Sequence, residues 1–233
     1  MPLLELVTSS GLGSLLGMRH ALEPDHLAAV STLVTGERGS AKAAWLGACW
    51  GLGHTLTLVT AGAMLVVLRA EMPASASDAF ELSVALMLVG LGLRAVYRAA
   101  RQGPEGPTHL HHHGRMVHVH PGAPAHVHVG RWTLARRPLL VGAVHGLAGS
   151  GALTALVLAT LPSTAARLAY MTLFGLGSTV GMAALSGVLG WPLGHLARHR
   201  AVARGVSLAV GCVSIVVGVF WGYPLLGRLF LGG

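Results

Sequence analysis

An arginine, two histidines, a glutamate and an aspartate fall close together near the start of an otherwise apolar chain. Residues 17–30 read GMRHALEPDHLAAV and hold His20, Asp25 and His26 within seven positions. Imidazole and carboxylate groups are ligands that borderline divalent ions such as nickel, cobalt, zinc and copper accept. Imidazole binds a metal only in its neutral form, so metal ions and protons should compete for this segment.

Ionisable side chains inside a membrane are costly and mark functional sites. An Asp or Arg at the centre of a membrane helix costs about 2.5–3.5 kcal/mol on insertion scales, so these groups should face the interior of a helix bundle. For His20, Asp25 and His26 the alternative is a polar network that only holds helices together, but two histidines beside an acid favour metal ligation. We expect Arg19 and Glu23 to pair with each other at i, i+4.

Pro24 should break the helix that carries this cluster. Proline has no N–H and pushes the preceding residue out of helical dihedrals, so the first helix should end or kink near Leu22. A second helix should begin with Glu23 as N-cap and Pro24 at its first position. In an unbroken helix His20 and Asp25 would lie about 140° apart around the axis. The break should bring them together and free carbonyl oxygens as further ligands.

Two other histidines lie in apolar segments. His54 stands in GLGHTLT, where Gly51 and Gly53 permit close approach of another helix. His145 stands in GAVHGLAGSG, at a position that resembles that of His20 but without the following acid. Both are candidate metal ligands, and the alternative for both is a histidine packed in the helical core.

The elements that must position these residues are membrane helices. The chain is 53% hydrophobic and 10% charged, with a mean hydropathy of +0.65, whereas soluble domains carry about 25% charged residues. The formal charge of +8 does not indicate nucleic-acid binding, because the arginines gather at segment ends and in loops. Stretches long enough to cross a bilayer, which takes about 20 helical residues, lie near 3–33, 41–69, 79–99, 138–161, 165–191 and 204–230.

The sequence contains an internal repeat. Residues of the first span recur 125 positions later in the fourth, as the pairs Gly17 and Gly142, His20 and His145, and Leu22 and Leu147. WGLGHT, which starts at Trp50, matches FGLGST, which starts at Phe174, 124 positions later. Each half holds three spans, so consecutive halves enter the membrane from opposite sides. The predicted fold is therefore an all-α integral membrane protein, with six transmembrane helices as two inverted three-helix repeats.

That architecture is typical of secondary transporters, whose substrate site lies near the midplane where the repeats meet. Gene duplication without a transport function is the alternative. The parts predicted are a first repeat with the metal motif at 1–100, a His-rich loop at 101–137 and a second repeat at 138–233.

The loop combines many histidines with frequent proline and glycine and shows no helical period, so we expect it to be disordered until it binds a ligand. Its two HVH motifs would put both imidazoles on one side of an extended segment, which favours metal binding over a solvated linker. The loop histidines are His109, His111, His112, His113, His118, His120, His126 and His128.

Loop charges predict the orientation. Twelve of the sixteen arginines and lysines fall on one side of the predicted spans, against Arg69, Arg167 and Arg228 on the other. The positive side of membrane proteins is cytoplasmic. We therefore expect a multi-pass protein of a bacterial-type inner membrane, with both termini outside and the His-rich loop in the cytosol.

RHALEPDH resembles the His-x4-Asp-His signature of the nickel/cobalt transporter family, and GLGHT resembles the histidine motif of that family's second helix. HGLAGS and FGLGSTVGM resemble second-half motifs of its shorter, six-span relatives, which include urease-associated nickel permeases. The resemblance implies transport of nickel or cobalt, with His20, Asp25, His26 and His54 as ligands along the pathway.

The chain also departs from the family pattern. Glu23 and Pro24 stand where the family usually has aspartate and alanine, which bears on ion preference. The well-studied uptake members have eight spans rather than six, and a cytosolic histidine loop resembles the efflux branch. The direction of transport is therefore left open.

The predicted function is secondary transport of Ni²⁺ or Co²⁺ by alternating access, with no enzyme activity and no prosthetic group. Besides the ion and the lipid bilayer, a cytosolic metallochaperone is a candidate partner, nucleic acid is not, and the oligomeric state is left open. One alternative is a sulfite-type exporter of small anions, with Arg19 and half-helix N-termini as attractors. Another is a membrane thiol-disulfide conduit, but Cys49 and Cys212 do not occupy equivalent repeat positions.

Overall fold

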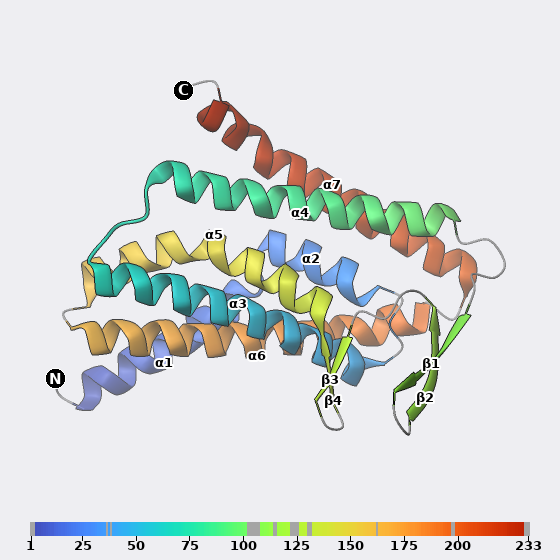
Figure 1. The fold of residues 1–233 in the computed structure, drawn as a ribbon, viewed down its shortest axis with the longest axis horizontal. Coiled ribbons are helices and arrows are strands. Elements are labelled where there is room, and N and C mark those ends of the chain that lie inside the picture. The colour runs from blue at the N-terminus through green and yellow to red at the C-terminus, as the bar shows by residue number, and fades with distance from the viewer. Residues whose placement is uncertain are drawn as a thin grey trace.

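The computed structural model describes residues 3–35, 37, 39–101, 108–113, 116–121, 126–129, 132–161, 163–196 and 199–230. Within these ranges the chain forms helices and short strands, drawn in Figure 1: α1 (Leu3–His20), α2 (Pro24–Val34), α3 (Ser40–Leu68), α4 (Ala74–Arg101), β1 (Thr108–His113), β2 (Met116–Pro121), β3 (His126–Val129), β4 (Trp132–Ala135), α5 (Arg136–Thr160), α6 (Thr164–Leu196) and α7 (Arg200–Phe230).

The helices pack in two groups with α2 between them. Helix α3 packs against both α5 and α6, and α1 packs along α6. Helices α4 and α7 pack along each other and lie on one side of this first group (Figure 1). Helix α2 contacts α4, α6 and α7, so the short segment after the predicted break is enclosed by both groups.

The connections alternate between the two ends of the bundle. The start of α1, the end of α7 and the α3–α4 and α5–α6 connections lie at the left end of Figure 1. The α2–α3 and α6–α7 connections and the strands lie toward the other end. The gap between α1 and α2 falls inside the bundle, which places the residues on either side of it far from both ends.

Four helical segments are long and apolar enough to cross a membrane: α3, α4, α6 and Ala201–Phe230 of α7. The protein is therefore a multi-pass membrane protein of helical class. The broken α1–α2 pair and α5, whose side chains are described only in part, are not among these four. Six spans stay a prediction.

Glycines allow the helices of the first group to touch backbone to backbone. A Cβ atom added at Gly17 in α1 would overlap the carbonyl group of Phe174 in α6. A Cβ atom added at Gly142 in α5 would likewise overlap the carbonyl group of Trp50 in α3. Small residues at helix contacts are the usual means of close packing in membranes, where helices gain no hydrophobic burial from association.

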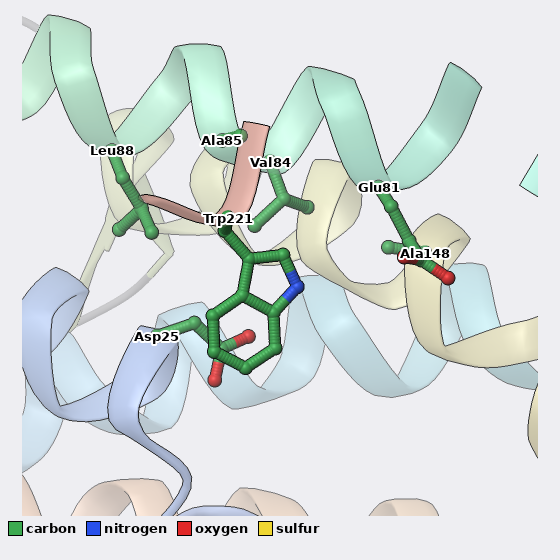
Figure 2. Close-up of a pocket in the computed structure, with 7 residues that line it drawn as sticks. All are labelled: Asp25, Glu81, Val84, Ala85, Leu88, Ala148 and Trp221. Carbon is green, nitrogen blue, oxygen red and sulfur yellow. The ribbon is translucent and has the colours of Figure 1, made fainter. Parts of the chain in front are cut away.

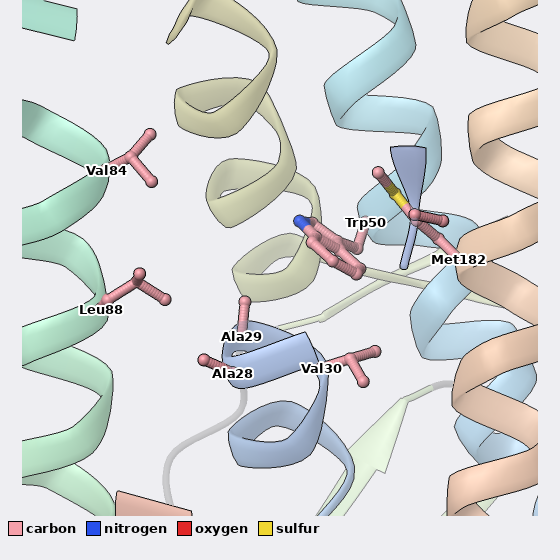
Figure 3. Close-up of a cluster of buried hydrophobic side chains, with 8 residues drawn as sticks. Ala28, Ala29, Val30, Trp50, Val84, Leu88 and Met182 are labelled. Carbon is pink, nitrogen blue, oxygen red and sulfur yellow. The ribbon is translucent and has the colours of Figure 1, made fainter. Parts of the chain in front are cut away.

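Buried apolar side chains surround α2. One cluster, shown in Figure 3, joins α2 to α3, α4 and α6 and consists of Ala21, Ala28, Ala29, Val30, Trp50, Val84, Leu88 and Met182. A second cluster joins α3, α5 and α6 and consists of Leu58, Val66, Leu153, Val157, Met171 and Phe174. The two clusters hold the helices on both sides of the α1–α2 break.

The described parts of the His-rich segment form two antiparallel hairpins, β1–β2 and β3–β4, where the sequence predicted a chain without regular structure. Alternating valine, threonine and histidine suits extended backbone, which accounts for the difference. The β1–β2 register sets His109 opposite His120 and His111 opposite His118. That a ligand is needed to order the loop stays a prediction, as do the boundaries of the three predicted parts.

Candidate metal centre

The helix break occurs as predicted. Helix α1 ends at His20 and α2 begins at Pro24, with Glu23 as N-cap in an extended conformation (φ −65°, ψ 150°). The break was expected to free carbonyl oxygens, but that of His20 is not free, because the Glu23 N–H donates to it at 3.1 Å. Pro24 cannot donate this bond, and a tight turn lets the residue before it do so.

The expected pairing of Arg19 with Glu23 is also wrong, since no ion pair joins them in the described part of the chain. Instead Glu23 Oε1 lies 2.9 Å from His20 Nδ1. The i, i+4 geometry requires a continuous helix, and α1 ends between these two residues. Glu23 therefore holds the His20 ring, while the buried Nε2 atom of that ring has no hydrogen-bond partner among the described residues.

The structure brings together all five residues predicted as intramembrane ligands. His20, His26 and His54 each offer a ligand atom within 4.8 Å of the others, and Asp25, His26 and His145 do the same. The ring centroid of His26 lies 4.5 Å from those of His20 and of His145. His26 belongs to both groups, so the two groups form one continuous cluster.

Asp25 joins two of the imidazoles. Its Oδ1 atom lies 3.1 Å from His26 Nδ1, and its Oδ2 atom lies 3.1 Å from His145 Nε2. An ionised carboxylate only accepts hydrogen bonds, so each ring donates an N–H to Asp25. A histidine held in this way presents its other nitrogen to a metal. These nitrogens, His26 Nε2 and His145 Nδ1, are buried and have no partner among the described residues.

The cluster is almost closed to solvent. His26, His54 and His145 are 1%, 0% and 2% exposed. Both ring nitrogens of His54 lack a hydrogen-bond partner in the described ranges. A buried polar atom left without a partner costs about 1–3 kcal/mol, and native proteins keep few of them. Several such nitrogens lie close together here, in an arrangement that could hold a cation.

Two aromatic residues flank the histidines. The Trp50 ring lies 5.3 Å from that of His26 and 5.7 Å from that of His145, and the Phe174 ring lies 5.4 Å from that of His20. Neither residue was predicted as part of the site, although each begins one copy of the repeated motif.

Ser178 and Thr179, the counterparts of His54 and Thr55 in the repeat, make contacts between helices. The Ser178 hydroxyl donates to the Gly17 carbonyl oxygen at 3.1 Å. Thr179 Oγ1 lies 2.8 Å from Thr55 Oγ1 across the α3–α6 contact. These bonds tie α6 to the helices that carry His20 and His54.

The eight loop histidines have their backbones in β1, β2 and β3, and their side chains lie outside the described part of the structure. Metal binding by this loop stays a prediction.

Comparison with known proteins identifies relatives over nearly the whole chain. The family NicO, described as high-affinity nickel-transport protein, matches residues 6–226. Urease accessory protein UreH of Bacillus sp. (strain TB-90) is 31% identical over 225 residues, which cover 97% of this chain and 95% of that protein.

Two plant proteins are also similar. Chloroplast protein FOR GROWTH AND FERTILITY 1 of Arabidopsis thaliana is 30% identical over 94% of this chain and 61% of its own length. Chloroplast protein FOR GROWTH AND FERTILITY 2 is 26% identical over 80% of this chain and 48% of its own length. No solved structure matches the chain.

Proposed function

The chain belongs to the NicO family of high-affinity nickel-transport proteins, and on that premise we propose that it moves Ni²⁺ or Co²⁺ through the histidine cluster between α1, α2, α3 and α5. As a member of this family it is a membrane transporter and not an enzyme. The observation that carries the proposal is the convergence of buried imidazole nitrogens without partners, of which His54 has two.

The spacing of the ligand atoms fits a single ion at each of two positions. Metal–nitrogen bonds of about 2.0–2.1 Å put ligands on opposite sides of an ion about 4 Å apart. The first position has His20, His26 and His54, whose atoms lie within 4.8 Å of one another, and the second has Asp25, His26 and His145. His26 is common to both, so the two positions adjoin, and an ion at the second one would replace the ring protons that Asp25 accepts.

The proposed mechanism is alternating access between two inverted three-helix repeats. Helix contacts that occur once in each half of the repeat support it. Gly17 touches Phe174, and the equivalent residues Gly142 and Trp50 touch each other. In the same way Gly53 touches Leu139, and Gly177 touches Ser14. Thr55 and Thr179, which are equivalent residues, touch each other. Equivalent residues of two related halves are expected to touch each other on the axis that relates the halves. His54 of the cluster is next to Thr55 in the chain, so the histidine cluster lies beside this axis.

We also propose that the protein lies in an inner membrane with both termini outside and the His-rich loop in the cytosol. The common location of the start of α1, the end of α7 and the α3–α4 turn at one end of the bundle supports this (Figure 1). The turn carries Arg69, one of the three basic residues on the side that has few of them, and that side is expected to face outward.

The two alternatives have less support. A small anion at the start of α2 would meet the carboxylate groups of Glu23 and Asp25, which repel it. A thiol-disulfide conduit needs two cysteines that react with each other, whereas Cys49 is buried, Cys212 is exposed and both are free thiols.

The test is nickel and cobalt flux into liposomes that contain the purified protein. Flux of either ion is expected with the natural chain and not with Asp25→Ala or His26→Ala, provided that the variants still purify as folded protein. Flux retained by either variant would contradict the proposed site. In cells, higher metal accumulation with the gene than without it indicates uptake, and lower accumulation indicates export.

A further inference from the structure

A small cavity opens beside the metal centre. It has a volume of about 40 Å³, which exceeds the roughly 10–15 Å³ that one water molecule needs. It lies between α2, α4, α5 and α7, and Figure 2 shows the residues that line it: Asp25, Glu81, Val84, Ala85, Leu88, Ala148 and Trp221. The cavity therefore reaches one of the candidate ligands from the side of α4 and α7.

Glu81 brings a second carboxylate group to this cavity. It lies in α4, one of the helices long and apolar enough to cross a membrane, and its side chain is partly buried. Among the described residues no cation pairs with Glu81, whereas Asp78, one turn earlier, lies 3.2 Å from Arg228. An ionisable group within a membrane helix marks a functional position, above all when it faces a wet cavity.

The two carboxylate groups differ in what they can bind. Both oxygens of Asp25 already accept hydrogen bonds, from His26 and His145. Within the described residues no hydrogen bond or ion pair joins Glu81 to another side chain, so its oxygens are available to a cation or to the water bound to one. Trp221 of α7 lines the same cavity as Asp25 and Glu81 (Figure 2).

We propose that this cavity is the outer passage to the metal centre and that Glu81 binds the partly hydrated divalent cation before Asp25 does. This inference rests on the proposed transport function. Glu81 lies about two turns from the start of α4, at the end of the bundle that carries the α3–α4 turn. The passage therefore leads to the side opposite the His-rich loop, and Glu81 replaces water that the ion loses as it enters.

The experiment compares nickel flux and nickel binding for three proteins. Glu81→Gln removes the charge and keeps the size, and Glu71→Gln makes the same change in the exposed turn before α4, away from the cavity. We expect Glu81→Gln to lower the initial rate of flux roughly tenfold. Equilibrium binding of nickel to the detergent-purified protein should stay at the natural level, and Glu71→Gln should match the natural chain in both measurements.

A second variant tests the passage without a change of charge. Ala148→Val puts two methyl groups into the cavity and should also slow flux while nickel still binds. Natural rates in both Glu81→Gln and Ala148→Val would overturn the passage. Loss of nickel binding in Glu81→Gln would overturn it too, because Glu81 would then act on the centre itself. A natural chain that neither binds nor moves nickel would instead contradict the proposed function.

Discussion

At the scale of single residues, His26 occupies the central place in the candidate site. Its Nδ1 atom is held by Asp25, its Nε2 atom is buried without a partner in the described chain, and it belongs to both groups of ligands. His54 and His145 each belong to one group. If both groups bind the ion, nickel affinity should depend more on His26 than on His54 or His145.

We therefore predict that His26→Ala abolishes nickel binding, because it takes a ligand from both positions. His54→Ala and His145→Ala should each leave weakened binding, with losses of at least the roughly 10–100-fold that follows removal of an outer-shell partner of a metal ligand. Titration calorimetry on purified protein measures these affinities. His195→Ala is the matched control, since His195 is exposed near the end of α6 and contacts Trp191, through its ring and the Trp191 carbonyl oxygen, away from the site. Equal losses in all three site variants would argue against two positions.

At the scale of elements, the site depends on how closely α1 approaches α6 and α5 approaches α3. These contacts bring the rings of His20 and His145 each to 4.5 Å from that of His26, because each of these two histidines lies one turn from a glycine that touches a facing backbone. The requirement is steric: a side chain at Gly17 or Gly142 would displace a whole helix rather than a flexible group. Displacing the helix would move the ligand that it carries.

Gly17→Ala and Gly142→Ala should each destabilise the protein by about 1–3 kcal/mol, the usual cost of overpacking. Both should also weaken nickel binding. Gly90→Ala in α4 is the control, because a Cβ atom at Gly90 meets nothing within 4 Å and alanine favours the helix. Thermal unfolding in detergent measures the effect. If the unfolding temperature of Gly17→Ala were no lower than that of Gly90→Ala, the contact between Gly17 and Phe174 would not be tight.

At the scale of the whole molecule, the bundle has two distinct ends. The exposed side chain of Glu71 lies in the α3–α4 turn at one end, and exposed Lys42 lies at the start of α3, at the other end. The excess of basic residues near Lys42 predicts that its end faces the cytosol. The orientation decides which side of the membrane the Glu81 cavity faces.

Single cysteines at these positions test the orientation. In a background with Cys49→Ser and Cys212→Ser, a membrane-impermeant maleimide should label Glu71→Cys in intact cells. Lys42→Cys should be labelled only after the cells are opened. The opposite pattern would reverse the topology, and the cavity would then lead to the cytosol.

The sequence by itself determined the local features of this protein. Pro24 ends one helix and starts the next through its missing N–H, and the break appears at that position. Hydropathy identified the helices that can cross a membrane, because residues that face lipid must be apolar over a whole span. Residue type identified the five candidate ligands, since imidazole and carboxylate groups are conspicuous in apolar segments.

Only the tertiary structure decided which of these groups meet. The sequence predicted a pair of Arg19 and Glu23, but the orientation of the turn gives Glu23 to His20. The position of Asp25 between His26 and His145 depends on the contact of α2 with α5, 120 residues apart. Glu81 was not singled out from the sequence, where it stands alone near the start of its predicted span, and it lines a cavity with Asp25 only once α2, α4, α5 and α7 pack together. Such contacts depend on how helices pack in three dimensions, which neither spacing nor composition specifies.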